Sequence, residues 1–412
     1  MQTKNQLRPY QIEGVERLIS FDHDAILADE PGLGKTIQVA HYINLTKPFT
    51  ALIVCPASLR LNWRHELDKW LDSALCLDIL SYEGATKLST DFKYDLIVFD
   101  EAHYLKNPKA ARTKAGLSLP AFRRLFLTGT PIVNKPMDMY PILKAIGLNM
   151  SMSGFGKRYC NGHLKRIRHK PYPKYAWDFS GASNTEELHK LLVDNVMVRR
   201  RKKDVLTELP AKVRQVIEID TPHGDDPELK KVLVQKYGSL TAAAEALIDD
   251  GGIAFGDLSR YRLEQAKHKL PYVINYLDNL MEETDKVVVF AYHREIIEAL
   301  QTQYPAAVHL YGGMSDKEKD AAVTSFQQGD APLFIGQITA AGTGITLTAS
   351  STVVFAELDW VPGNVIQAED RCHRMGQTDN VHIVHLVLKD SIDCRMVQAL
   401  VRKQQIIEEV IK

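Results

Sequence analysis

DEPGLGKT, residues 29–36, is the segment that carries most information about the fold of this chain. It follows the apolar run 25–28, a predicted buried strand, and leads into 36–44, whose apolar residues recur at helical spacing. Glycines in a strand–loop–helix turn let backbone N–H groups face a phosphate, and the helix N-terminus adds partial positive charge. We therefore predict that Lys35 reaches the β- and γ-phosphates of a nucleotide and that the Thr36 hydroxyl binds Mg²⁺.

This segment departs from the general pattern G-x-x-x-x-G-K-[ST], because Asp29 stands where the pattern has its first glycine. Taken alone, it would also fit a glycine-rich turn before a helix. A second motif favours the nucleotide site, since Asp100-Glu101-Ala102-His103 follows the segment 92–99, which ends in the predicted strand 96–99. A carboxylate that ends a buried strand can bind Mg²⁺ opposite Thr36, and Glu101 can orient an attacking water.

Apolar runs and helical patterns alternate in both halves of the chain. Parallel sheets covered by helices on both faces have this pattern, so we predict an α/β fold of two lobes, 1–212 and 213–412. Two long stretches, 132–197 and 221–270, are interpreted as mostly helical insertions. The remaining predicted elements are strands at 51–55, 96–99, 124–127, 287–291, 332–335, 352–355 and 382–388, and a helix at 296–303.

Charge is distributed unevenly between the two halves. Residues 1–212 carry 32 Lys and Arg against 22 Asp and Glu, whereas residues 213–412 carry 19 against 29. The basic excess gathers in 156–175, which contains tyrosines and no acid, and in the run Arg199–Lys203. A solvated face is the usual interpretation of one charge run. Basic residues interleaved with tyrosines favour contact with a nucleic-acid backbone instead.

Cysteine content and hydropathy limit the cellular compartments in which this protein is expected. Five scattered cysteines fit a reducing compartment better than a disulfide framework. No run of about 18 apolar residues occurs, so no membrane partner is expected. The N-terminal residues lack the apolar stretch of a secretory signal. The small size and the lack of a basic nuclear-type tail lead us to expect a cytoplasmic protein of bacterial or viral origin.

QAEDRCHRMGQ, residues 367–377, is the densest chemical stretch of the second half. Arg371 and Arg374 lie three residues apart, so on a helix they would share one face. Two guanidinium groups directed at a nucleotide could stabilise charge on a transferring γ-phosphoryl group. An isolated R-x-x-R would more often form surface ion pairs with Glu369 or Asp370. The phosphate-binding lobe has no arginine finger of its own, which favours the catalytic interpretation.

Six motifs, in this order, resemble those of the SNF2 family of superfamily 2 motors. They are RPYQ at 8–11, DEPGLGKT at 29–36, PASLRLNW at 56–63, DEAH at 100–103, LTGTP at 127–131 and QAEDRCHRMGQ at 367–377. The segment 199–212 resembles the connector that follows the first lobe in this family. FGKRYC at 155–160 and WDFSGASNTEEL at 177–188 resemble its annealing-helicase, fork-remodelling branch.

The resemblance implies two tandem RecA-like lobes that use ATP and Mg²⁺. It implies a catalytic set of Lys35, Asp100, Glu101, Arg371 and Arg374, and ATP binding by Arg8, Gln11, Gly32, Gly34, Lys35 and Thr36, with Thr36 and Asp100 holding the metal. It places Ser58, Thr339 and Gly342 on the DNA backbone. It makes His103, Thr128, Thr130, Trp360 and Gln367 coupling residues, although Trp360 could also be plain core. Asp29 is normal in this family, whereas Pro31 replaces the usual Met and removes one loop N–H.

These observations predict an ATP-dependent translocase that moves along or remodels double-stranded or forked DNA as a monomer. Little base specificity is expected, because loops of Gly, Ser and Thr touch phosphates and read no base edge. No wedge for strand separation is recognisable in the sequence. The alternatives are a processive DNA helicase with the same core, and a motor subunit or ATP-switch scaffold that needs a protein partner.

Overall fold

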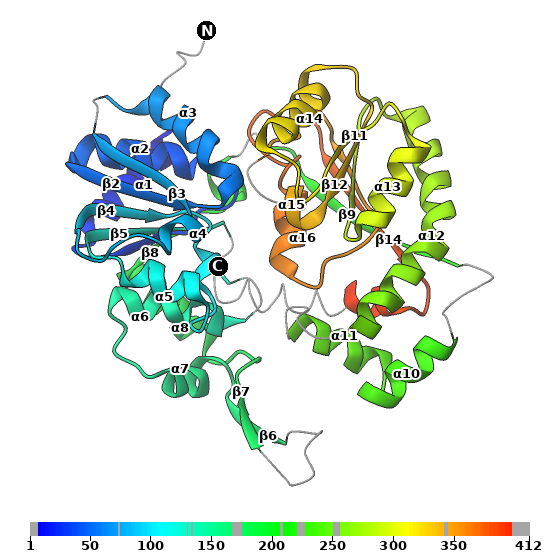
Figure 1. The fold of residues 1–412 in the computed structure, drawn as a ribbon, viewed down its shortest axis with the longest axis horizontal. Coiled ribbons are helices and arrows are strands. Elements are labelled where there is room, and N and C mark those ends of the chain that lie inside the picture. The colour runs from blue at the N-terminus through cyan, green and yellow to red at the C-terminus, as the bar shows by residue number, and fades with distance from the viewer. Residues whose placement is uncertain are drawn as a thin grey trace. The chain divides into compact units, whose positions relative to one another are not determined.

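The computed structural model of the chain describes residues 7–72, 75–129, 131–132, 135–166, 175–206, 209–220, 227–249, 256–341 and 345–397. These residues form two compact units, and each is described by itself (Figure 1). Unit 1 comprises the described residues up to 206, and unit 2 comprises those from 209 onward. The predicted α/β class with parallel sheets is confirmed in both units.

Unit 1 is built on a six-stranded parallel sheet with the order β3-β2-β4-β5-β1-β8. Its elements are α1 (Pro9–Ser20), β1 (Ala25–Leu27), α2 (Lys35–Thr46), β2 (Thr50–Cys55), η1 (Ala57–Leu59), α3 (Arg60–Trp70), β3 (Cys76–Ser81), α4 (Tyr82–Ala85), β4 (Tyr94–Phe99), η2 (Ala102–Leu105), α5 (Ala111–Ser118), β5 (Ala121–Leu127), η3 (Pro136–Met139), α6 (Tyr140–Ile146), α7 (Met152–Tyr159), β6 (His163–Arg166), β7 (Tyr175–Asp178), α8 (Thr185–Asn195), β8 (Met197–Val198) and α9 (Lys202–Val205).

The four strands predicted for the first half are present as β1, β2, β4 and β5. The two edge strands were missed, for different reasons. β3 is only partly buried, so its sequence lacks a continuous apolar run. β8 is two residues long, which is too short to leave a period-2 pattern.

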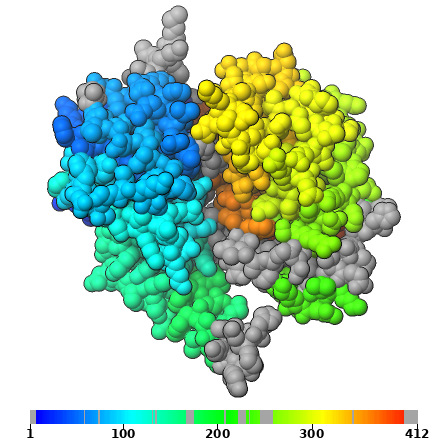
Figure 2. All heavy atoms as spheres, viewed as in Figure 1, coloured from blue at the N-terminus to red at the C-terminus, as the bar shows by residue number. Residues whose placement is uncertain are grey.

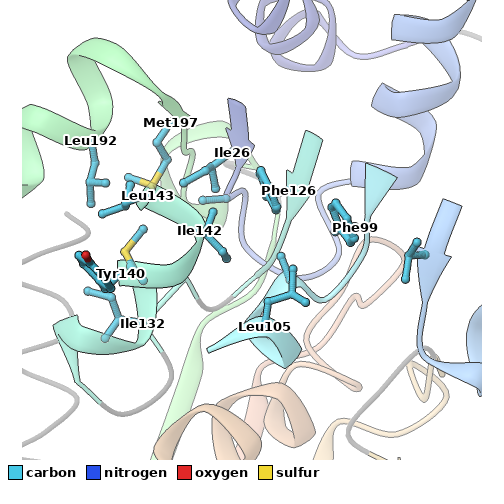
Figure 3. Packing of buried hydrophobic residues seen from close by; sticks show 14 of the residues in the cluster. Ile26, Phe99, Leu105, Phe126, Ile132, Tyr140, Ile142, Leu143, Leu192 and Met197 are labelled. Carbon is cyan, nitrogen blue, oxygen red and sulfur yellow. The ribbon is translucent and has the colours of Figure 1, made fainter. Parts of the chain in front are cut away.

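Both faces of this sheet are covered by apolar packing. Successive strand residues point to opposite faces, so Ile26 and Phe126 join one cluster while Leu27 and Leu125 join the other. On the first face, Phe99 and Phe126 stack with ring centroids 5.2 Å apart. Helices α6 and α8 add Leu143 and Leu192 to the same cluster, where Figure 3 shows them near Met197. The atoms of this helical segment continue directly from those of the sheet region in Figure 2. Both ends of the stretch 132–197, predicted as an insertion, thus contribute to the core of unit 1.

Unit 2 is built on a second six-stranded parallel sheet, with the order β11-β12-β10-β13-β14-β9. Its elements are β9 (Lys212–Ile219), α10 (Pro227–Tyr237), α11 (Leu240–Asp249), α12 (Gly256–Glu283), β10 (Val287–Ala291), α13 (Arg294–Gln303), β11 (Val308–Leu310), α14 (Asp316–Gln328), β12 (Leu333–Gln337), α15 (Ile338–Ala341), β13 (Thr352–Phe355), α16 (Pro362–Glu369) and β14 (Val381–Leu388).

The predicted strands of the second half correspond to β10, β12, β13 and β14. β9 was missed because four of its eight residues are polar, so the segment shows no continuous apolar run. It pairs with β14 along its whole length, from Lys212 opposite Val381 to Ile219 opposite Leu388. No helix among the described residues is long and apolar enough to cross a membrane.

Candidate functional site

Three motif loops of unit 1 follow adjacent strands of the same parallel sheet. The phosphate loop, residues 29–36, follows β1, the DEAH segment follows β4, and Thr128 follows β5, which lies between the other two strands. The carboxyl ends of parallel strands share one edge, where ligands of open α/β sheets bind. Lys35 and Asp100 are near enough to interact electrostatically. The buried Thr128 donates its N–H to the Leu27 carbonyl at 3.1 Å, while Thr130 lies outside the described residues.

Helix α1 supports the phosphate loop through the side chain of Gln11. Gly34 has φ +79°, and a Cβ atom added there would lie 2.5 Å from Gln11 Nε2, so the position requires glycine. Gln11 is buried and uses both ends of its amide. Its Nε2 donates to the Leu33 carbonyl at 3.1 Å, and its Oε1 accepts from the Arg8 N–H at 2.9 Å. Gln11 therefore holds the loop, and Gly32, with φ +90°, shapes the same turn.

Asp29, the residue that breaks the general loop pattern, is the centre of a buried polar cluster. Arg200 donates to its carboxylate from Nε at 3.0 Å, from Nη2 at 2.5 Å and from the backbone N–H at 2.9 Å. Gln38 donates to the same carboxylate at 2.9 Å. Lys35 Nζ donates to the Asp29 carbonyl at 2.8 Å. We call Asp29, Gln38 and Arg200 the loop clamp, because they fix the phosphate loop to the segment after β8.

The loop clamp corrects the interpretation of the basic run Arg199–Lys203. Arg199 donates to the Ala28 carbonyl at 2.7 Å, and the Lys202 N–H donates to Glu30 at 2.7 Å. With Arg200 bound to Asp29, three of the five residues of this run bind the phosphate loop or the strand before it, and the Arg199 and Arg200 side chains are engaged there. Arg201 is more exposed and binds Asp204 at 2.7 Å. The sequence signal that could have indicated this role is the unusual Asp29, which needs a buried cation.

Asp100 is buried, and its carboxylate accepts a hydrogen bond from an aromatic residue of the 56–63 motif for which no role was predicted. Trp63 Nε1 donates to Asp100 Oδ2 at 2.7 Å, and the Tyr82 hydroxyl donates to the Asp100 carbonyl at 2.8 Å. Burial, helped by the neighbouring Glu101 carboxylate, raises the pKa of Asp100 to about 6. The Trp63 hydrogen bond and Lys35 oppose this rise. The ionised Asp100 carboxylate is therefore not fully neutralised by its neighbours, and a divalent cation would supply the missing positive charge.

Glu101 and His103 lie beside Asp100 at the edge of the sheet. Glu101 adopts a left-handed backbone conformation with φ +50°, which costs a non-glycine residue free energy. His103 Nδ1 lies 3.2 Å from Glu101 Oε2. This contact could transmit a change at Glu101 to the DEAH segment.

In unit 2, the two motif arginines are not on a helix, so their spacing does not place them on one helix face. Helix α16 ends at Glu369, and Arg371 and Arg374 lie in the turns that follow. Both arginine side chains nevertheless bind the same short segment, residues 345–346. Arg371 Nη1 donates to the Ile345 carbonyl at 3.3 Å, and Arg374 Nη1 donates to the Thr346 hydroxyl at 3.3 Å.

The burial of Arg371 limits how it can act. Its side chain is part of the core of unit 2, with 1% of the residue exposed. Its Nε donates to the carbonyl of Gln367, which is itself buried on α16. Contact between Arg371 and a nucleotide would therefore require a rearrangement of this turn.

Glu369 and Asp370 have cationic partners on β9. Arg214 binds Glu369 at 2.6 Å, and Lys212 binds Asp370 at 2.8 Å and Glu369 at 3.4 Å. Burial alone would raise the pKa of Glu369, but Lys212 and the hydrogen bonds from His385 and Arg214 hold it well below its usual range. This ion-pair cluster fixes the end of α16 to the sheet and so positions the turn that carries the two arginines.

The other predicted residues of unit 2 are more scattered. Trp360 is buried against the Tyr292 ring, with centroids 4.6 Å apart, and the Arg262 guanidinium lies 5.0 Å from its ring centre. Thr339 is exposed on the short helix α15 that follows β12. Gly342 lies outside the described residues, as does the side chain of Ser58, whose backbone is in η1.

The described residues contain no group of three or more His, Cys, Asp or Glu side chains that could hold a metal ion. A magnesium ion does not need one, because it commonly binds through one or two carboxylates together with substrate phosphates and water. Thr36 at the start of α2 and Asp100 at the end of β4 fit this mode.

A parallel sheet with a glycine-containing phosphate loop after one strand and an acidic pair after a neighbouring one defines the phosphate-loop class of nucleotide-binding proteins. Comparison with protein families gives a narrower result. Residues 10–93 and 79–244 match the family described as "SNF2-related domain", and residues 268–376 match "Helicase conserved C-terminal domain". This chain belongs to the SNF2 family, as the motifs predicted.

Two curated proteins illustrate what this chain is similar to. The SWI/SNF-related matrix-associated actin-dependent regulator of chromatin subfamily A-like protein 1 of Xenopus tropicalis is 33% identical over 94% of this chain and 43% of its own length. The DNA annealing helicase and endonuclease ZRANB3 of Homo sapiens is 32% identical over 97% of this chain and 40% of its own length. The chain thus spans less than half the length of these relatives, and the resemblance to their branch is confirmed.

Among solved structures, the Sulfolobus solfataricus SWI2/SNF2 ATPase core in complex with dsDNA aligns with 99% of this chain and 93% of its own, with 25% identity and a TM-score of 0.45. The curated relatives named above are animal proteins. They do not fit the bacterial or viral origin that we expected from the sequence.

Proposed function

We propose that this chain is an ATP-dependent DNA translocase of SNF2 type that hydrolyses ATP to move along or remodel double-stranded or forked DNA. The observation that carries the proposal is the buried Asp100, followed by Glu101 and lying within electrostatic reach of the phosphate-loop Lys35. Membership of the SNF2 family supports the same conclusion, as do relatives whose names describe DNA annealing helicases.

In this mechanism the chain of unit 1 binds the triphosphate and prepares the attacking water. The loop N–H groups and Lys35 hold the β- and γ-phosphates, and the loop clamp keeps that geometry before the nucleotide arrives. Glu101 accepts a hydrogen bond from the water and orients it toward the γ-phosphorus. Arg8 and Gln11 are proposed to face adenine from the start of α1, where Gln11 already contacts the loop.

Thr36 and Asp100 are the residues proposed to hold Mg²⁺, which would neutralise phosphate charge during transfer. Ionised Asp100 is the form that binds the cation, so binding lowers its pKa from the raised value. A cation bound there would offset the repulsion between the buried Asp100 and the neighbouring Glu101.

Unit 2 is proposed to supply charge stabilisation and part of the DNA contact. Arg371 and Arg374 would stabilise the γ-phosphoryl group once the turn after α16 releases Arg371 from the Ile345 carbonyl. Thr339 and Gly342, together with Ser58 of unit 1, would contact the DNA backbone. The coupling residues would be His103, Thr128, Thr130, Trp360 and Gln367.

A processive DNA helicase with the same core is the second candidate, and the motor subunit of a larger assembly that needs a protein partner is the third. Turnover with different DNA structures separates them. A translocase that remodels branched DNA is stimulated most by duplex or forked DNA, whereas strongest stimulation by single strands or RNA would favour the helicase. A subunit that needs a partner would be stimulated by none of them.

Replacement of Glu101 by Gln tests the catalytic assignment. Glu101→Gln keeps the size of the side chain and removes its charge, so we expect loss of DNA-stimulated ATP hydrolysis with retained ATP binding. Turnover is measured as phosphate release, and binding with a fluorescent ATP analogue. Glu83→Gln, at an exposed acid on the short helix α4, is the matched control and should keep full activity. Near-normal hydrolysis by Glu101→Gln would refute the proposed role.

A further inference from the structure

The two-stranded hairpin β6–β7 is the feature of unit 1 that the nucleotide site does not use. Figure 1 shows it projecting beyond helices α7 and α8. It belongs to neither of the apolar clusters that cover the sheet. Its strands pair antiparallel, with His163 opposite Asp178 and Arg166 opposite Tyr175. An isolated two-stranded hairpin is only marginally stable in water, so its persistence here needs support from the rest of the unit.

That support comes from close packing at the base of the hairpin. The Phe179 ring occupies the space beside two glycines, and a Cβ atom added at Gly156 or Gly162 would lie 2.4 Å or 2.7 Å from the ring. The Ser183 N–H donates to the Tyr159 carbonyl at 3.0 Å, which ties the chain after β7 to the end of α7. The hairpin is therefore held in a fixed direction by helix α7.

The two faces of the hairpin differ in chemistry. Residues that pair or alternate by two share a face, so Leu164, Tyr175 and Trp177 lie together, and we call them the hairpin face. Asp178 lies on the opposite face, where Lys165 binds it at 3.0 Å. Within the described strands, the hairpin face thus carries no acidic residue.

The hairpin face is exposed although it is apolar. Leu164, Tyr175 and Trp177 are 57%, 61% and 43% exposed. Trp177 is held in place, because the Phe179 ring stacks beside it at 5.8 Å and Lys157 Nζ lies 4.4 Å from its ring centre. Grouped, rigid and uncovered apolar side chains with a polar rim mark an interaction surface.

We propose that the hairpin face binds unpaired bases of a branched DNA by stacking. Exposed rings on a basic element are how proteins bind single strands without base specificity, since every base has a π-face and the cations take the phosphates. Lys157 supplies a cation beside the Trp177 ring, with its Nζ 4.4 Å from the ring centre. Within the described strands, no acidic residue lies on this face. This favours a polyanionic ligand over a protein partner, because a surface that binds a protein has no need to exclude acidic residues.

This inference rests on the proposed function only in taking DNA as the substrate. It adds a site for the single-stranded part of that substrate, which the sequence analysis did not find. The hairpin would bind the unpaired bases of a fork, while the ATPase acts on the paired region. The protein could then distinguish a fork from an uninterrupted DNA duplex. The signal in the sequence was present in the basic segment 156–175, but its tyrosines were assigned to backbone contact.

The test measures DNA binding by the full chain without nucleotide. Fluorescence anisotropy gives Kd for a splayed-arm DNA with two unpaired arms and for a blunt duplex with the same paired region. Tyr175→Ala should weaken binding of the splayed-arm DNA about tenfold, which is the loss expected for one stacked base, and change blunt-duplex binding less than about twofold. The slope of log Kd against log salt should not change, because no charge is removed.

Two variants control for the ring and for position. Tyr175→Phe keeps the ring and should bind like the original protein. Phe49→Ala removes an aromatic side chain that is 82% exposed elsewhere in unit 1 and should also have no effect. Equal weakening of both DNAs by Tyr175→Ala, or no weakening of either, would overturn the inference. Wild-type turnover that no DNA stimulates would refute the proposed function, but it would leave the stacking result standing, because this assay needs no ATP.

Discussion

Removal of Arg200 should destabilise unit 1 strongly although Arg200 lies outside all the motifs assigned to the nucleotide. Arg200→Ala leaves the Asp29 carboxylate fully buried with Gln38 and one backbone N–H as its remaining donors. Loss of one partner from a buried ion pair costs about 3–5 kcal/mol. Two donors to the carboxylate remain, so we expect the lower end of this range, about 3 kcal/mol. That is a large part of the stability of an ordinary domain.

Urea denaturation followed by tryptophan fluorescence measures this loss. Trp63, Trp70 and Trp177, three of the four tryptophans, lie in unit 1, so the signal reports mainly on that unit. The control is Arg201→Ala, which removes the neighbouring arginine from a more exposed pair with Asp204 and should cost less than about 1 kcal/mol.

Catalysis provides a second measurement on the same two variants. The KM for ATP should rise in Arg200→Ala, because the phosphate loop is no longer fixed, and stay unchanged in Arg201→Ala. Equal stability of the two variants would refute the argument that the loop clamp holds the phosphate loop.

Two further substitutions test contacts around the same edge of the sheet. A Cβ atom at Gly129 would lie 2.6 Å from the Pro31 ring, so Gly129→Ala should lower the free energy of unfolding by about 1–3 kcal/mol. Pro31→Ala in the same chain should restore most of this loss, because it removes the ring that the new methyl group meets. Additive effects of the two substitutions on the free energy of unfolding would contradict this explanation. Trp63→Phe removes a hydrogen bond that favours ionised Asp100, so the pKa of Asp100 should rise further above about 6. The Mg²⁺ concentration for half-maximal ATP turnover should then increase at pH 6 and change little at pH 8, and an equal change at both pH values would exclude this cause.

The sequence was a good guide to elements that are buried or carry a motif. Fully apolar runs predicted the central strands of both sheets, because a strand covered on both faces needs apolar residues throughout. Motif order was sufficient to predict that the phosphate loop and the DEAH segment meet, since both follow strands of one parallel sheet.

Prediction failed where tertiary contacts decide the outcome. The three-residue spacing of Arg371 and Arg374 would put them on one face of a helix, but α16 ends at Glu369, where Arg214 and Lys212 from β9 bind the last residue. Those partners lie more than 150 positions away along the chain. Arg200 was taken for part of a nucleic-acid contact for the same reason, because its partner Asp29 is 171 positions away.

The packing of Phe179 between two glycines also has an evolutionary consequence. The base of the hairpin is fixed by residues that lie outside its strands, so the chain joining β6 to β7 is free to vary in length. In general, each doubling of the length of a connection costs only about 0.6 kcal/mol in loop-closure entropy. Insertions, deletions or exchanged sequences between residues 166 and 175 should therefore be tolerated by the sheet of unit 1. Related chains could diverge in the DNA structures that they prefer by changing this one segment while the ATP-hydrolysing residues stay the same.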